Sequence, residues 1–85
     1  MSSHLETLKF AIKSELLAKF KSVKSKEGDV LSRDWLYNDF LPSLSRNEEK
    51  ALEETVSEMI NEGLIEYIAG VKATYRLTKK GADAL

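Results

Sequence analysis

The chain has 85 residues, of which 42% are hydrophobic and 32% are charged, and its net charge at pH 7 is −1. These values are typical of one small folded domain, and the chain is too apolar to be disordered. It has no cysteine, which excludes a disulfide framework and a cysteine-based zinc site. No apolar run approaches the ~20 residues of a membrane span, and the first residues lack a secretory signal pattern, so we expect a cytoplasmic protein.

The small net charge hides a segregation of charge along the chain. Residues 1–26 sum to +4, residues 27–45 to −3, residues 46–62 to −4 and residues 63–85 to +2. A basic start, an acidic middle and a mildly basic end form the main clue in the sequence to what the protein binds.

The amino-terminal segment, residues 1–26, contains a long predicted helix over residues 4–23. Its apolar residues recur at steps of three and four, with no glycine or proline between them: Leu5, Leu8, Ile12, Leu16, Phe20 and Val23. A second, narrower row beside this stripe mixes apolar and basic residues: Phe10, Lys13, Leu17, Lys21 and Lys24. Two interpretations of this row stay open. Either the lysines extend from the edge of a broad core-facing stripe, or Phe10 and Leu17 contact something outside the chain.

A polar break over residues 24–29 ends this helix. Val30 and Leu31 follow it and are too few for an independent strand, but they can add one rung to the edge of a sheet.

Ser32 is a good N-cap for a short helix over residues 33–41. Three large side chains of this helix can turn inward: Trp35, Leu36 and Phe40. We expect Trp35 to belong to the core rather than to act as a stacking platform. Pro42 is expected to end the helix, because the residue before a proline is pushed out of the helical region.

Ser45 and Glu48 form a capping box in front of a strongly periodic stretch, which predicts a helix over about residues 46–62. The predicted buried stripe of this helix consists of Leu52, Val56, Met59 and Ile60. Gly63 stands where the residue after a helix adopts a left-handed conformation, and Leu64 supplies the usual hydrophobic contact.

Residues 64–68 and 74–78 are rich in β-branched and aromatic side chains, and a glycine-containing connection joins them. They are therefore expected to form a hairpin, with Tyr75 and Leu77 on one face and Arg76 on the other.

A last short helix is predicted over residues 79–85. Thr78 can cap its start, whereas Gly81 is expected to weaken it.

Two stretches of the chain resemble the winged helix-turn-helix family. Residues 59–65 (MINEGLI) look like the end of the family's third helix, and residues 75–81 (YRLTKKG) look like the end of its wing. The resemblance implies an α+β fold with three helices, a C-terminal β-hairpin wing and a short final helix. It implies one winged-helix domain over residues 1–85, with the helix-turn-helix and wing in residues 30–85.

The resemblance also implies a transcription regulator that binds double-stranded DNA, with the third helix in the major groove and the wing against the backbone or minor groove. The expected DNA contacts are Arg46, Asn47, Lys50, Lys72, Arg76, Lys79 and Lys80. The first three stand at the start of the third helix, where the helix dipole favours an anion. However, Glu54 and Glu58 are expected on the same side of that helix, where they would repel phosphates.

This acidic helix leaves open an alternative function, a winged-helix module that binds protein rather than DNA. The acidic helix and the mixed row of the first helix are the two expected binding faces. Glu58 follows Glu54 and precedes Glu62 by four residues, and such like-charge pairs destabilise a helix unless a basic partner relieves them. We hypothesise that the mixed row is a homodimer surface, made of Phe10, Lys13, Leu17, Lys21 and Lys24.

Nothing in the sequence predicts enzyme chemistry. His4 is the only histidine, there is no cysteine nucleophile, and no glycine-rich phosphate loop is present. We expect no catalytic residue, no cofactor and no metal.

Overall fold

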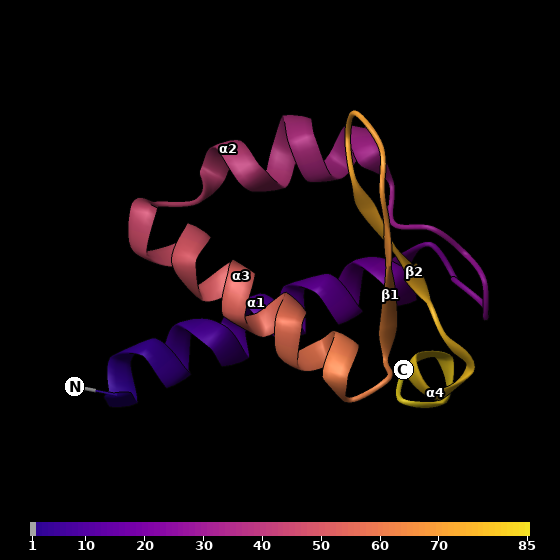
Figure 1. Cartoon of the computed structure of the whole chain (residues 1–85), viewed down its shortest axis with the longest axis horizontal. Coiled ribbons are helices and arrows are strands. Elements are labelled where there is room, and N and C mark those ends of the chain that lie inside the picture. The colour runs from indigo at the N-terminus through magenta and orange to yellow at the C-terminus, as the bar shows by residue number, and fades with distance from the viewer. Residues whose placement is uncertain (1) are drawn as a thin grey trace.

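The computed structural model describes residues 2–85, with side chains from His4 onward. Met1, the first residue of the predicted amino-terminal segment, lies outside the described residues. The elements in chain order are α1 (Ser2–Ser22), the π-helical segment η1 (Trp35–Phe40), α2 (Leu41–Ser43), α3 (Arg46–Asn61), β1 (Ile65–Ile68), β2 (Thr74–Leu77) and α4 (Lys79–Asp83). Helices and one two-stranded antiparallel sheet confirm the predicted α+β class. In Figure 1, α1 passes behind α3, the hairpin stands across one end of the helices, and α4 lies at its foot.

The apolar stripe of α1 forms one side of the core, as its spacing predicts. Ile12, Leu16 and Phe20 are buried. The prediction is wrong for Val23, whose side chain is 59% exposed. The helix ends at Ser22, so Val23 lies beyond the last turn and past the edge of the core.

The second helical stretch runs continuously over residues 33–43 and passes through a π-helical turn. The prediction that Pro42 ends it is wrong, because Leu41 keeps helical angles and the helix continues to Ser43. The N–H of Leu41 donates to the carbonyl of Leu36, five residues back. A proline ring collides with the carbonyl four residues earlier in a regular α-helix, and the wider π-turn relieves that collision.

Trp35 packs against the core from this helix, as expected. Its ring is half-buried and stacks on Phe40, with ring centroids 4.8 Å apart. The ammonium of Lys19, which belongs to α1, lies 5.5 Å from the centroid of the Trp35 ring.

Both ends of α3 are fixed by the local signals read from the sequence. The Glu48 N–H donates to the Ser45 hydroxyl over 3.3 Å, and the Ser45 N–H donates to the Glu48 carboxylate over 2.9 Å. At the other end Gly63 has a φ of +79°, and the Leu64 N–H donates to the carbonyl of Met59 over 2.9 Å. These contacts satisfy backbone groups that the helix itself leaves unpaired.

The buried side of α3 is displaced around the helix from the predicted stripe. Leu52, Val56 and Met59 are buried as expected, but Ile60 is 37% exposed. Ala51 and Thr55 are buried in its place. Their small side chains let α1 approach closely, and the Thr55 hydroxyl donates to the backbone carbonyl of Lys9 over 3.4 Å.

The predicted hairpin forms, with Ile65 opposite Leu77 and Tyr67 opposite Tyr75. The predicted extra rung is also present, because Val30 pairs with Arg76 as an isolated antiparallel bridge. Three extended segments therefore lie side by side, with β2 in the middle.

Gly81 has the opposite role from the one its helix propensity predicts. Thr78 caps α4 as expected, accepting a hydrogen bond from the Gly81 N–H over 3.0 Å. A Cβ atom at Gly81 would lie 2.1 Å from the carbonyl oxygen of Leu64 and 2.8 Å from Cδ1 of Leu77. Gly81 is therefore the residue that allows α4 to close against the hairpin.

Candidate interaction surfaces

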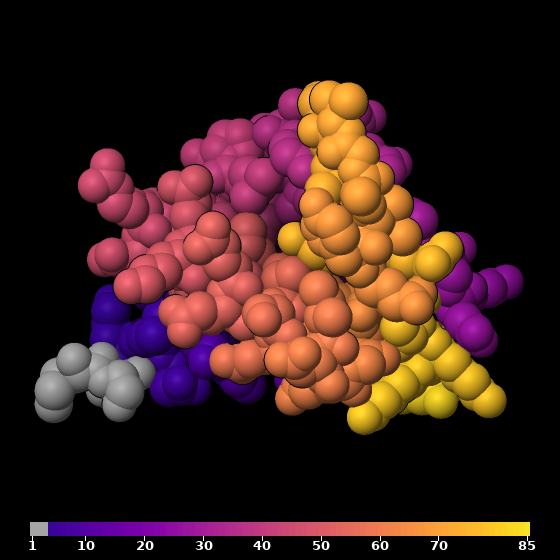
Figure 2. Space-filling model, in the orientation of Figure 1, coloured from indigo at the N-terminus to yellow at the C-terminus, as the bar shows by residue number. Residues whose placement is uncertain are grey.

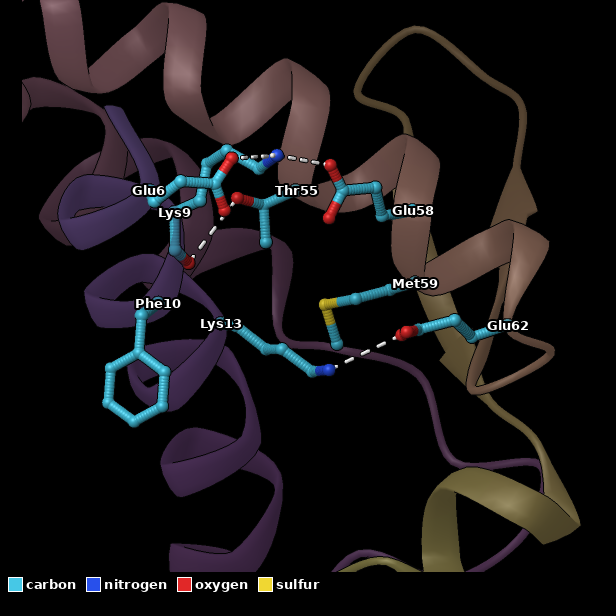
Figure 3. Close-up of a pocket in the computed structure, with 8 residues that line it drawn as sticks. All are labelled: Glu6, Lys9, Phe10, Lys13, Thr55, Glu58, Met59 and Glu62. Atoms are coloured by element: carbon cyan, nitrogen blue, oxygen red, sulfur yellow. Dashed lines mark hydrogen bonds and ion pairs between the residues drawn. The ribbon is translucent and has the colours of Figure 1, made fainter. Parts of the chain in front are cut away.

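A shallow cleft of about 170 Å³ separates α1 from the carboxyl-terminal half of α3 (Figure 3). Lys9 reaches across it to the carboxylate of Glu58. The Lys9 ammonium also lies 3.4 Å from the carboxylate of Glu6. Lys13 pairs with Glu62 over 3.3 Å. Thr55 and Met59 also line this α1–α3 cleft.

The two ion pairs across the α1–α3 cleft correct the expectation for the acidic helix. The hydrogen bond from Lys9 to Glu58 raises the pKa of the lysine above 10.5, while partial burial of its side chain opposes that effect. Glu58 and Glu62 therefore have basic partners in α1 of the same chain. The pairing turns both carboxylates toward α1, and both side chains stay exposed, at 55% for Glu58 and 51% for Glu62.

The side of α3 opposite its buried residues carries mainly basic and polar side chains. Four exposed residues lie opposite the buried stripe, by the 3.6-residue period of the helix: Arg46, Lys50, Ser57 and Asn61. We call these four the α3 outer row. Glu53 and Glu54 flank it, and the described residues include no ion-pair partner for either of them. Figure 2 shows α3 and the hairpin next to each other on the same face of the molecule.

Three of the seven predicted DNA contacts come together. Arg46, Asn47 and Lys50 are all exposed on the first two turns of α3. The described residues contain no ion-pair partner for Arg46 or Lys50.

The hairpin bases already have partners within the chain. The Arg76 guanidinium pairs with Glu66 across the two strands, with Nε 3.0 Å from the carboxylate. The Lys72 ammonium lies 5.8 Å from the centroid of the Tyr37 ring, and Arg33 donates to the Lys72 carbonyl over 2.8 Å. The hairpin connection is therefore fastened to the helix over residues 33–43.

Lys79 and Lys80 are exposed on α4, at the far end of α3 from Arg46. The Lys80 side chain lies beside Gly63, which follows the last turn of α3. With a rise of 1.5 Å per residue, the length of α3 puts roughly 24 Å between that turn and Arg46. The seven predicted contacts thus form separate groups rather than one basic patch.

The predicted self-association row is also divided. Phe10 is 73% exposed and Lys21 is exposed, whereas Leu17 is half-buried against the core. Lys13 turns to Glu62 across the α1–α3 cleft. Lys24 follows the end of α1 and has a φ of +55°.

Lys9 is the residue of this region that sequence reasoning missed. It precedes Lys13 by four residues, just as Glu58 precedes Glu62. Two pairs with the same spacing lie on one face of each helix, so they match when the helices pack side by side. This matched spacing is a signal that a search for complementary helix faces would detect.

Within residues 2–85 no three side chains of the kinds that bind metal ions come together. No helix in the same range is long and apolar enough to cross a membrane. Comparisons with protein-family models, with curated proteins and with solved structures find no match to this chain.

Proposed function

We propose that the chain is a winged-helix domain that binds double-stranded DNA through the α3 outer row, with the hairpin as its wing. The order of elements supports the fold: a first helix, a single sheet rung at Val30, two further helices and a hairpin whose second strand pairs with that rung. In a helix-turn-helix the second helix of the motif enters the major groove, and here that helix is α3.

The observation that carries this proposal is the position of the α3 glutamates. Glu58 and Glu62 pair with lysines of α1, and Glu48 caps the start of the helix. The α3 outer row is left to face solvent, with residue types suited to DNA. Arg46 and Lys50 neutralise phosphates, and Ser57 and Asn61 hydrogen-bond to base edges.

The two flanking glutamates limit the affinity. Glu53 and Glu54 face the same solvent as the α3 outer row and repel phosphates, so we expect weak binding that is detected only at low salt. Lys72, at the hairpin connection, is placed for a further phosphate contact once it leaves the Tyr37 ring.

The test is a fluorescence-anisotropy titration of a 20-base-pair duplex at several salt concentrations. We expect an affinity that falls steeply with salt, and a logarithmic slope that drops by roughly 2 in the double variant R46A/K50A, because each phosphate contact adds about 0.9 to the slope. The matched control K24A/K26A removes the same charge near the end of α1 and is expected to keep the wild-type slope.

Two results would contradict DNA binding by α3. One is no retained duplex at about 20 mM salt, where phosphate contacts are strongest. The other is an equal loss of affinity in R46A/K50A and K24A/K26A, which would show attraction by overall charge rather than by the α3 outer row.

A second candidate function, binding of a basic protein segment, is favoured by Glu53 and Glu54. They are carboxylates on the α3 face without a cation among the described residues, while Arg76 and Lys72 of the hairpin are engaged internally. The double variant E53Q/E54Q separates the candidates. If DNA is the ligand, the variant binds the duplex more tightly than the wild type, because two repulsive charges are removed. If the partner is a protein, neither the wild type nor the variant binds the duplex.

A further inference from the structure

Two basic side chains meet where the hairpin connection touches the helix over residues 33–43. The Arg33 guanidinium donates through Nε to the backbone carbonyl of Lys72 over 2.8 Å, and the Lys72 ammonium lies 5.8 Å from the centroid of the Tyr37 ring. Arg33 and Tyr37 are four residues apart and therefore share one side of the helix. In Figure 1 the turn of the hairpin stands beside the start of this helix. We call these two residues the Arg33–Lys72 pair.

The contacts that hold the Arg33–Lys72 pair in place neutralise neither charge. Their partners, a carbonyl oxygen and an aromatic ring, are uncharged, and no carboxylate of the described residues forms an ion pair with either side chain. Both residues are exposed. Arg33 also lies in the first turn of its helix, where the helix dipole disfavours a positive charge. Asp34, the nearest acid in the sequence, is displaced by about 100° around the helix from Arg33. Two like charges are thus held together at a place where a bound anion would be stabilised.

We propose that the Arg33–Lys72 pair binds a phosphate group. A guanidinium has five N–H donors in a planar fork, and the contact with the Lys72 carbonyl uses the Nε donor alone. The other donors suit the oxygens of a phosphate. Lys72 supplies the second charge when its ammonium turns from the Tyr37 ring to the anion. The Tyr37 hydroxyl donates to the carbonyl of Ala73, so the connection that carries Lys72 is already fixed beside Arg33.

The backbone of double-stranded DNA is one source of this phosphate, and that assignment rests on the proposed function. Figure 2 shows α3 and the hairpin next to each other, so a duplex on the α3 outer row lies beside the hairpin. A free phosphate compound carries the same chemical group and is the other source. In both cases Arg33 is a binding residue outside the seven contacts predicted from the sequence.

An NMR titration of the ¹⁵N-labelled protein with inorganic pyrophosphate at low salt tests the site without DNA. We expect saturable shifts of the Arg33 Nε–H and of the amides of Lys72 and Ala73. In K72Q, which keeps the backbone carbonyl that holds Arg33, these shifts should weaken several-fold at equal pyrophosphate concentration. The matched control K26Q removes one exposed lysine elsewhere and should keep the wild-type response.

Two results would overturn the phosphate site. One is a set of shifts at the Arg33–Lys72 pair no larger than those at Lys24 and Lys26, which would show general attraction of the anion by exposed bases. The other is a K72Q variant that responds to pyrophosphate like the wild type.

The duplex titration distinguishes the two sources of phosphate. If DNA supplies it, the logarithmic salt slope of R33Q/K72Q is lower than that of the wild type by roughly 2, because each phosphate contact adds about 0.9, and K24A/K26A keeps the wild-type slope. A wild-type slope in R33Q/K72Q, with the pyrophosphate response of the native chain intact, would assign the site to a free phosphate compound. A chain that responds to pyrophosphate but retains no duplex would contradict the proposed function and still support the phosphate site.

Discussion

At Gly81, helix propensity and tertiary packing favour opposite outcomes of the same substitution. Propensity alone predicts that Gly81→Ala stabilises α4 by about 1 kcal/mol. The close approach of Leu64 and Leu77 predicts the reverse, since the nearest atom to the new methyl is a backbone carbonyl that cannot turn aside. We expect a loss of roughly 1–3 kcal/mol in the free energy of unfolding, measured by urea denaturation. A gain in stability would show that the α4 contact is looser than described.

Residue burial was predictable from periodicity only where a side chain is large and central. Leu16, Phe20 and Leu52 follow the period and are buried. Ile60 fails because the helix faces α1 with Thr55, a residue that composition places outside a core. A small polar residue that hydrogen-bonds to a neighbouring helix has no periodic signature, so the exact rotation of α3 required the partner helix to be known.

At the scale of the element, the start of α3 is held by a charge whose contribution depends on pH. The Ser45 backbone N–H lowers the pKa of Glu48 below its ordinary value of 4.5. Its contribution to stability is therefore complete above pH 4.5 and is lost as the pH falls through the lowered pKa. We expect Glu48→Gln to be less stable than wild type at pH 7, and the difference to shrink as the pH is lowered below 4.5 in thermal melts. A difference that stays constant over that range would contradict a role for the charge.

The capping signals predicted the ends of elements better than the proline stop signal did. The capping box at Ser45, the left-handed Gly63 and the cap at Thr78 all occur as expected, because each depends on a few neighbouring residues. Pro42 was misjudged because a π-helical turn precedes it and leaves room for the proline ring, while Leu36 and Phe40 of that turn are buried. Such a turn has no motif of its own in the sequence.

At the scale of the whole molecule, the folded chain pairs charged residues that the sequence shows only as separate basic and acidic segments. The sequence shows a basic segment and an acidic helix, and predicts repulsion from DNA. Folding places Lys9 and Lys13 against Glu58 and Glu62, so two of the six glutamates in residues 46–62 are paired within the chain. The pairing joins residues 49 positions apart, so only a comparison of the two helix faces could reveal it. The predicted DNA contacts stay a prediction, and the structure scatters them in space, apart from those at the start of α3.

The most direct measurement of the proposed function is an NMR titration of the ¹⁵N-labelled protein with a 20-base-pair duplex at low salt. An 85-residue chain gives resolved amide signals, and each one reports on its own position. We predict that the largest shifts arise at Arg46, Lys50, Ser57 and Asn61, with little change around Phe10. No shifts at all, or shifts confined to α1 and α4, would contradict the claim that the outer row of α3 is the DNA-binding face.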